Sequence, residues 1–204
     1  PLTAIKLKED DELINVSIYK EDTLFVTNNG LYLRFKTSEI PVVGVKASGV
    51  KGINLKDDYV IYASTIKEED EYLNIYTNLN TGKRLKLTDL VYISRAKKGN
   101  MLFKKAKTKD YKIKFAYLTT SRDVNLCKID NDLNEIKNSE IPIMDINSTG
   151  STITKKRVDL WTLKAEEINL LNRNNNQEDT PKKELDKKEN EQLSFASFIE
   201  DFKI

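Results

Sequence analysis

Hydrophobic and polar residues alternate along most of residues 1–160, which is the pattern of β-strands with one buried face. The clearest example is LFVTNNGLYLRF at residues 24–35, where two apolar runs flank Asn28-Asn29-Gly30. Asn-Gly between such runs is a strong hairpin signal, because both residues tolerate the positive φ angles of a tight turn. No long stretch in this range keeps apolar residues at the i, i+3, i+4 and i+7 spacing of a helix. The pattern therefore predicts an all-β fold.

The hairpin region recurs twice more along the chain. SEIP occurs at residues 38–41 and again at 139–142, and residues 73–99 align with residues 23–49 at an offset of 50. The second and third copies also carry turn-prone residues at the hairpin tip, NLNTG and DNDLN. A period near 50 residues is the size of a propeller blade. We therefore expect three repeat units, near residues 12–58, 59–108 and 109–160.

Further alternating segments lie on either side of each hairpin. ELINVSIY, YVIYASTI and YKIKFAYLTT precede the three hairpins, and VKGINL and GNMLFK follow the first two. Each is predicted to form a strand. The expected architecture is a propeller-like arrangement of about three to four four-stranded blades, spanning residues 1–166.

Composition argues against catalysis. The chain of 204 residues has no His and a single Cys, so the commonest general base and the usual metal and thiol ligands are missing or scarce. Cys127 lies in VNLCKI and is expected to be a small buried strand residue. No nucleotide-binding or hydrolase motif occurs, and the acidic pair Asp57-Asp58 sits beside a turn. We expect no active site, no metal and no cofactor.

Without an apolar run of 18 residues or a signal-like start, no membrane insertion is expected either.

Positive charge is concentrated in one part of the chain. The net charge is +2, but residues 83–114 carry twelve Lys or Arg and two Asp. Alternate residues on a strand share a face, so Arg84 is expected to point with Lys86, and Arg34 with Lys36. If the units stack regularly, these pairs form an outward basic band that can neutralise the phosphates of a duplex without reading its bases. Solubility and protection of strand edges are the alternative reasons for such lysines.

The repeats carry a family resemblance. GLYLRFKTSEIPVVGVKASGVKGINL, then GKRLKLTDLVYISRAKKG, then SEIPIMDINSTG resemble the C-terminal domain of the A subunit of bacterial type IIA topoisomerases, DNA gyrase and topoisomerase IV. The resemblance covers roughly residues 1–160. It implies a β-pinwheel, whose blades exchange strands with their neighbours and bend duplex DNA on a basic outer rim.

By position, the implied DNA contacts are Arg34, Lys36, Lys46, Lys51, Lys83, Arg84, Lys86, Arg95, Lys97 and Lys98. The implied partners are duplex DNA, the ATPase B subunit, and the rest of the A subunit, in the bacterial cytoplasm at the nucleoid.

The chain also departs from the family pattern. It holds fewer units than a complete pinwheel. It also lacks the glutamine-, arginine- and glycine-rich box of gyrase, and the absence of this box favours topoisomerase IV over gyrase. In the third unit Glu135 takes the position of Arg34 and Arg84, so we expect DNA to leave the rim there. Gly49, Gly99 and Gly150 are expected to be turn glycines, and Trp161 a core aromatic rather than a base-stacking platform.

The end of the chain has a different composition. Residues 167–204 are expected to be a flexible tail with a short amphipathic end, because residues 172–192 are highly charged and nearly free of aliphatic side chains. A protein-interaction module without direct DNA binding is the alternative function for the whole chain.

Overall fold

The computed structural model describes residues 5–44, 47–104, 109–130 and 132–164. Within these ranges the chain forms eleven strands and three short 3-10 helices. The strands are β1 (Asp22–Thr27), β2 (Leu31–Lys36), β3 (Val60–Ile66), β4 (Tyr72–Thr77), β5 (Thr81–Lys86), β6 (Asn100–Met101), β7 (Ile113–Thr119), β8 (Val124–Ile129), β9 (Asp132–Lys137), β10 (Ser151–Thr152) and β11 (Val158–Leu163). The helices are η1 (Thr37–Glu39), η2 (Leu87–Asp89) and η3 (Asn138–Glu140). The predicted all-β fold is confirmed.

The repeat is visible as three antiparallel hairpins, each followed by a 3-10 helix. These hairpins are β1–β2, β4–β5 and β8–β9. Gly30 at the first tip has a φ of 86°, as the Asn-Gly turn predicts. We call the segment that begins with each 3-10 helix a corner: the first corner is residues 37–43, the second 87–93 and the third 138–144. The corners carry the repeated sequence around SEIP.

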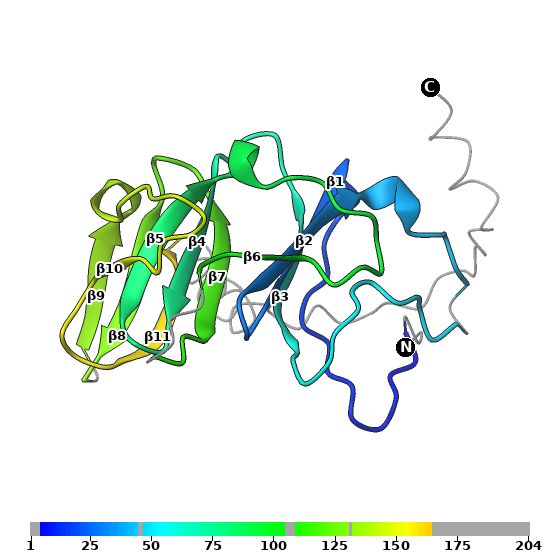
Figure 1. The fold of residues 1–204 in the computed structure, drawn as a ribbon, viewed down its shortest axis with the longest axis horizontal. Coiled ribbons are helices and arrows are strands. Elements are labelled where there is room, and N and C mark those ends of the chain that lie inside the picture. The colour runs from blue at the N-terminus through cyan, green and yellow to red at the C-terminus, as the bar shows by residue number, and fades with distance from the viewer. Residues whose placement is uncertain (1–4, 45–46, 105–108, 131, 165–204) are drawn as a thin grey trace, which may run out of the picture. The chain divides into compact units, whose positions relative to one another are not determined.

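Each sheet is completed by strands from later in the chain. Sheet 1 has the order β3-β1-β2-β6, sheet 2 has β10-β5-β4-β7, and sheet 3 has β11-β8-β9 among the described residues. Thus β3, which precedes the second hairpin in sequence, pairs with β1 of the first, and β7 pairs in the same way with β4 (Figure 1). The strands predicted at residues 12–19 and 50–55 do not form. Alternation identifies a strand but not the hairpin with which it pairs.

The described residues form three apolar clusters, of which two lie between sheets and the third covers Leu33 and Phe35 of sheet 1. The larger core joins sheets 1 and 2 through residues such as Leu24 and Leu73. The second joins sheets 2 and 3 around Trp161, which is fully buried and stacks on Tyr76 with ring centroids 3.6 Å apart. Cys127 is buried in the same core, and burial raises the pKa of its thiol to about 11. The predictions for Trp161 and Cys127 are confirmed.

An arginine joins sheet 1 to the second corner. Arg34 on β2 donates from Nη1 to the carbonyl oxygen of Leu87 at 2.7 Å, and its Nη2 pairs with Asp22 at 2.6 Å. The Tyr92 hydroxyl donates to the same Asp22 carboxylate at 2.6 Å, and the Arg34 guanidinium lies 4.5 Å from the centre of the Tyr92 ring. The backbone amide of Ile93 donates to the Arg34 carbonyl at 2.8 Å. We call this arrangement the first latch.

The second latch repeats the first one unit later. Arg84 on β5 donates from Nε to the carbonyl oxygen of Ile141 in the third corner at 2.7 Å. Its backbone amide donates to Pro142 at 2.8 Å, and its guanidinium lies 4.8 Å from the centre of the Tyr72 ring. Tyr72 occupies the position that Asp22 has in the first latch, so an aromatic face replaces a carboxylate as the partner of the cation. In both latches the guanidinium binds backbone carbonyl groups of a corner in the following unit.

A buried lysine adds a further link between sheets. The Lys83 side chain on β5 is completely buried, and its Nζ donates toward the carbonyl oxygens of Leu102, Asp145, Ile146 and Ser148 at 2.7–2.9 Å. Burial lowers the pKa of Lys83 to about 8, so the ammonium form still predominates at neutral pH. Four carbonyl groups around one ammonium satisfy all of its donors, which offsets the cost of taking the charge out of water.

Replacing Lys83 is expected to destabilise the fold strongly. In Lys83→Met, several buried carbonyl groups lose their donor, so the free energy of unfolding should fall by about 2–4 kcal/mol. Urea denaturation measures this change. Lys86→Met, on the same strand but exposed, is the control and should stay within about 0.5 kcal/mol of the wild type. Equal effects of the two variants would contradict the assigned role of Lys83.

Because of the first latch, the free energy of unfolding is expected to decrease at acidic pH. Burial raises the pKa of Asp22, but hydrogen bonds from Tyr92, Arg34 and Lys36 outweigh it, so the net pKa lies below the ordinary value of 3.8. The stabilisation is then present above about pH 4 and is lost as the pH falls through the lowered pKa of the folded state.

In Asp22→Asn the free energy of unfolding should therefore decrease less as the pH falls below 4. At neutral pH it should be lower than in the wild type by about 1–3 kcal/mol. Denaturation from pH 7 down to pH 2 checks both effects. Glu21→Gln removes an exposed carboxylate that pairs with Lys36 at 2.6 Å, and as the control it should change little. If the loss of stability at acidic pH is the same in Asp22→Asn as in the wild type, the role assigned to the Asp22 carboxylate is refuted.

Candidate nucleic-acid interface

Two loops from successive units are joined by backbone hydrogen bonds. The amide of Asn54 donates to the carbonyl of Lys97 at 2.9 Å, and the amide of Ala96 donates to the carbonyl of Gly52 at 2.7 Å. These bonds bring residues 51–56 of the first unit against residues 95–99 of the second. Both loops carry lysines. Because the pairing uses backbone groups, the lysine side chains stay exposed, although Lys51 Nζ donates to Asn54 Oδ1 at 2.6 Å.

Local geometry fixes the second loop. Arg95 donates from Nε to the Glu39 carbonyl at 2.8 Å and from Nη1 to the Lys51 carbonyl at 2.5 Å, so its guanidinium ties the loop to the first unit. Gly99 has a φ of 84°, and a Cβ atom there would lie 2.3 Å from the carbonyl oxygen of Tyr32. Only glycine fits such a position. The turn prediction for Gly49, Gly99 and Gly150 is confirmed, since all three have positive φ.

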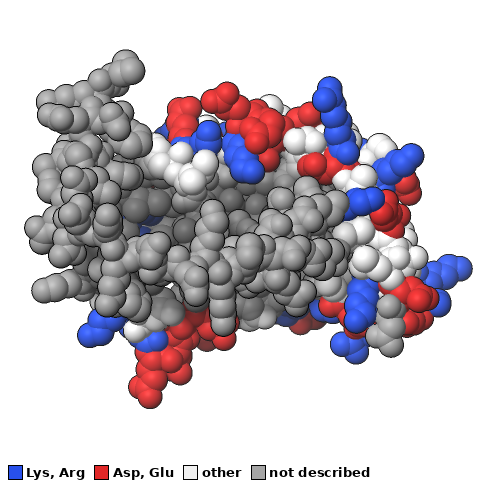
Figure 2. Space-filling model, turned by 180° about the vertical axis from the view of Figure 1, so that it is seen from behind, with Lys and Arg blue, Asp and Glu red and all other residues white. Residues whose placement is uncertain are grey.

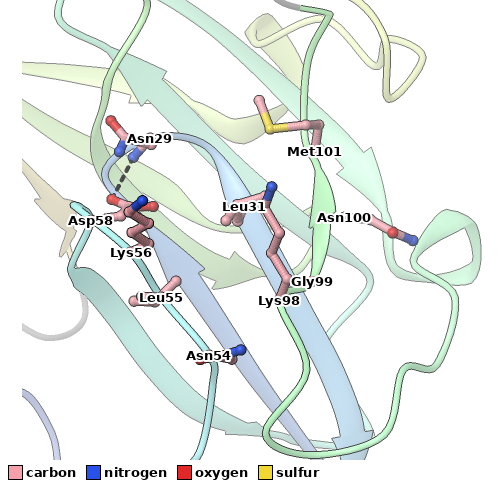
Figure 3. Close-up of a pocket in the computed structure, with 10 residues that line it drawn as sticks. All are labelled: Asn29, Leu31, Asn54, Leu55, Lys56, Asp58, Lys98, Gly99, Asn100 and Met101. Atoms are coloured by element: carbon pink, nitrogen blue, oxygen red, sulfur yellow. Dashed lines mark hydrogen bonds between the residues drawn. The ribbon is translucent and has the colours of Figure 1, made fainter.

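The loops gather four exposed lysines, which we call the lysine cluster: Lys51, Lys56, Lys97 and Lys98. Two of them line a groove of about 710 Å³, which Asn54, Gly99 and Asn100 also line. Lys56 extends from the segment 54–58 and Lys98 from the segment 98–101 on the other side of the groove (Figure 3). Asp58 also lines the groove, where its Oδ1 accepts the backbone amide of Asn29 at 3.0 Å. The site offers ammonium groups and amides to an anionic ligand.

Several of the predicted contact residues thus come together. Lys51, Arg95, Lys97 and Lys98 lie in the two paired loops, although the guanidinium of Arg95 is engaged in holding them. Lys86 is exposed at the end of β5. Lys46 lies outside the described residues, as does the whole predicted tail from residue 167. Whether any of these residues contacts DNA stays a prediction.

The expectation that Arg34 and Arg84 line an outward edge is wrong, and Lys83, an implied DNA contact, is not on the surface. Arg34 and Lys36 do share a face, since both contact Tyr92 and Asp22, but this face abuts the second corner. Arg84 is buried against the third corner, and Lys83 is buried among carbonyl groups. Strand alternation predicts which residues share a face, but it does not say whether a later segment covers that face.

Two lysines of this region were not among the predicted contacts. Lys56 belongs to the lysine cluster, and Lys112 reaches the rim of the groove by donating from Nζ to Asn29 Oδ1 at 2.5 Å. Lys112 is 83 residues from Asn29 in sequence. Lys112 belongs to the basic run of residues 83–114, but no local sequence signal places either residue at the groove, because both positions follow from long-range pairing between units.

Charge elsewhere is mixed. On the face shown in Figure 2, basic and acidic side chains of the described residues are interspersed, so this part of the surface shows no continuous basic band. Among the described residues no group of three potential metal ligands occurs. No helix in the described ranges is long and apolar enough to cross a membrane.

Comparisons with known proteins agree with this fold. A family model described as DNA gyrase C-terminal domain, beta-propeller, matches residues 2–20, 21–67 and 76–116. The A subunit of DNA topoisomerase 4 from Staphylococcus aureus is 37% identical over 123 residues, which are 59% of this chain and 15% of that relative. The chain thus spans a small part of the curated relatives that it matches.

Two solved structures show the same architecture. The C-terminal domain of DNA topoisomerase IV aligns with a TM-score of 0.73 and 30% identity, over 86% of this chain and 58% of that one. The DNA gyrase A C-terminal domain aligns with a TM-score of 0.67 and 18% identity, over 79% of this chain and 57% of that one, which supports the fold alone. Since the family model covers more than half of the residues, the chain belongs to the DNA gyrase C-terminal domain, beta-propeller family, the C-terminal domains of the A subunits of type IIA topoisomerases.

Proposed function

We propose that the chain binds duplex DNA without sequence preference and that the lysine cluster supplies its main contacts. The observation that carries this proposal is the pairing of residues 51–56 with residues 95–99, which gathers four exposed lysines on two adjacent loops, two of them lining one groove. A duplex carries one phosphate charge per about 1.7 Å of its axis, and a cationic site gains affinity by releasing the counterions of those phosphates.

The chemistry of the cluster favours phosphate contact over base reading. Lysine is a flexible point charge, whereas specific contact with guanine usually needs the planar fork of an arginine. The arginine of these loops, Arg95, has its Nε and Nη1 engaged with backbone carbonyl groups. A site of this kind attracts and orients DNA but does not select a sequence.

In the proposed role, the domain bends or wraps DNA and serves a type IIA topoisomerase. Membership of the family supports the assignment to the A subunit of such an enzyme. The proposed partners are the ATPase B subunit, together with the rest of the A subunit, in the bacterial cytoplasm at the nucleoid. By directing a duplex along its surface, the module would bias which DNA crossing the enzyme captures.

A protein-docking module is the second candidate function. The exposed apolar residues Ile40, Val42 and Val43 of the first corner favour it. The two candidates differ in their response to DNA. A DNA-bending module binds long duplexes more tightly than short ones and loses affinity steeply with salt, whereas a docking module shows neither property.

The lysine cluster is tested by neutral substitutions. If Lys97 and Lys98 both contact phosphates, Lys97→Gln with Lys98→Gln should lower the slope of log affinity against log salt by about 1.8, for all duplex sequences alike. The measurement is a binding titration across a range of salt concentrations, on a short and a long duplex.

The matched control is Lys137→Gln with Lys155→Gln. It removes the same charge from exposed positions of the third unit and should leave the slope unchanged. Equal slopes for the wild type and the Lys97/Lys98 variant would exclude this cluster as the contact surface. Absence of any binding that depends on duplex length would favour the docking module. Arg84→Glu is a poor test of binding, because it breaks the second latch.

A further inference from the structure

One loop of the third unit directs several of its carbonyl oxygens at a single buried point. Lys83 Nζ lies 2.7–2.9 Å from four carbonyl oxygens, those of Leu102, Asp145, Ile146 and Ser148. The loop turns at this place, because the backbone amide of Ser148 donates to the carbonyl oxygen of Asp145 at 3.0 Å. We call the four oxygens around Lys83 Nζ the carbonyl cage.

The carbonyl cage surrounds its occupant as a charge and not only as a hydrogen-bond donor. An ammonium group has three N–H donors, but four oxygens lie within hydrogen-bond distance of this one. Among the described residues no ion pair includes Lys83, so carbonyl dipoles rather than a neighbouring carboxylate stabilise its charge. An environment made only of carbonyl oxygens is also how proteins replace the hydration shell of potassium.

The size of the carbonyl cage selects among cations. Magnesium binds oxygen at about 2.0–2.1 Å and calcium at about 2.3–2.6 Å, and both prefer carboxylate or water ligands as well. The distances of 2.7–2.9 Å around Lys83 Nζ are longer than either. The carbonyl cage therefore fits a large monovalent cation, of the size of ammonium or potassium.

The first unit shows that the repeat does not need a cation at this position. Leu33 on β2 is the counterpart of Lys83 on β5, since Leu33 pairs with Phe25 and Lys83 pairs with Ile75 in the same register. Leu33 is completely buried too, but it packs in an apolar cluster with Phe35. The carbonyl cage is thus a particular feature of the second and third units and not a general condition for packing them.

We propose that the carbonyl cage is a binding site for a monovalent cation of the size of potassium, which the wild type fills with the ammonium group of its own Lys83. Shortening this side chain to its Cβ atom opens the space that Nζ and its methylene groups occupy, and the four oxygens then accept a free potassium, rubidium or ammonium ion. In the wild type the tethered ammonium excludes such ions. The stability of the wild type is therefore the same in potassium and in sodium salts.

The experiment removes the tethered ammonium and offers free ions in its place. The free energy of unfolding of Lys83→Ala is measured by urea denaturation at pH 7 in the chlorides of lithium, sodium, potassium, rubidium and ammonium at one ionic strength. An ion that binds only the folded state multiplies the folding constant by one plus the ratio of its concentration to its dissociation constant. We expect the folding constant to be at least about tenfold larger in potassium, rubidium or ammonium chloride than in lithium chloride.

Two controls separate site binding from general effects of salt. Lys83→Met fills the carbonyl cage with an apolar side chain of similar length, so it should be destabilised without any preference among the five salts. The wild type should show no preference either. If Lys83→Ala is unfolded in every salt, Lys83→Ser, which keeps an oxygen beside the cage, is measured in the same way.

A crystal structure locates the ion directly. Crystals of the folded alanine or serine variant grown in rubidium chloride should show an anomalous scattering peak between the four carbonyl oxygens. A crystal without rubidium at this place overturns the proposal. Equal responses of the Lys83→Ala and Lys83→Met variants to the five salts overturn it as well, and so does the failure of both the alanine and the serine variant to fold in potassium chloride.

Discussion

The arrangement of the units depends on how the carbonyl groups of each 3-10 corner are satisfied. A 3-10 turn of three residues leaves backbone acceptors without partners, and burying them unpaired is costly. Here the preceding unit supplies the donor, from Arg34 for the second corner and from Arg84 for the third. Because the donor and acceptor lie on different units, the same bond that satisfies the corner also joins two sheets.

The basic residues consequently divide into two groups with different physical roles. Arg34, Lys83 and Arg84 are held by carbonyl groups or carboxylates inside the protein, where their charges are already compensated. The lysines of residues 51–56 and 95–99 are exposed, and of their ammonium groups that of Lys51 donates to Asn54 Oδ1 at 2.6 Å. Net charge per segment does not separate these groups, since Lys83 and Lys98 belong to the same basic run. Only the free group is available to a polyanion.

Sequence reasoning predicted the local features well. Alternation and the Asn-Gly turn identified the hairpins, the repeat of SEIP identified the corners, and the positive φ of Gly99 followed from its place in the repeat. It did not predict that β3 completes the sheet of the earlier hairpin, nor that Arg34 faces a corner 53 residues away. Such pairings depend on backbone groups, which are the same for every residue type. The lysine cluster was found only in part for this reason, since its loops meet through backbone bonds.

Strand exchange has a consequence for the order in which the protein can assemble. Sheet 1 contains the hairpin of residues 22–36, but it also needs β3 at residues 60–66 and β6 at residues 100–101. During synthesis, the first hairpin therefore waits for about a third of the chain before its sheet is complete, and the second waits equally long for β10. Contacts of such long sequence separation slow folding, because loop entropy is lost before the pairing is gained. The units are interlocked, because sheets 1 and 2 are complete only when strands of the following units have joined them.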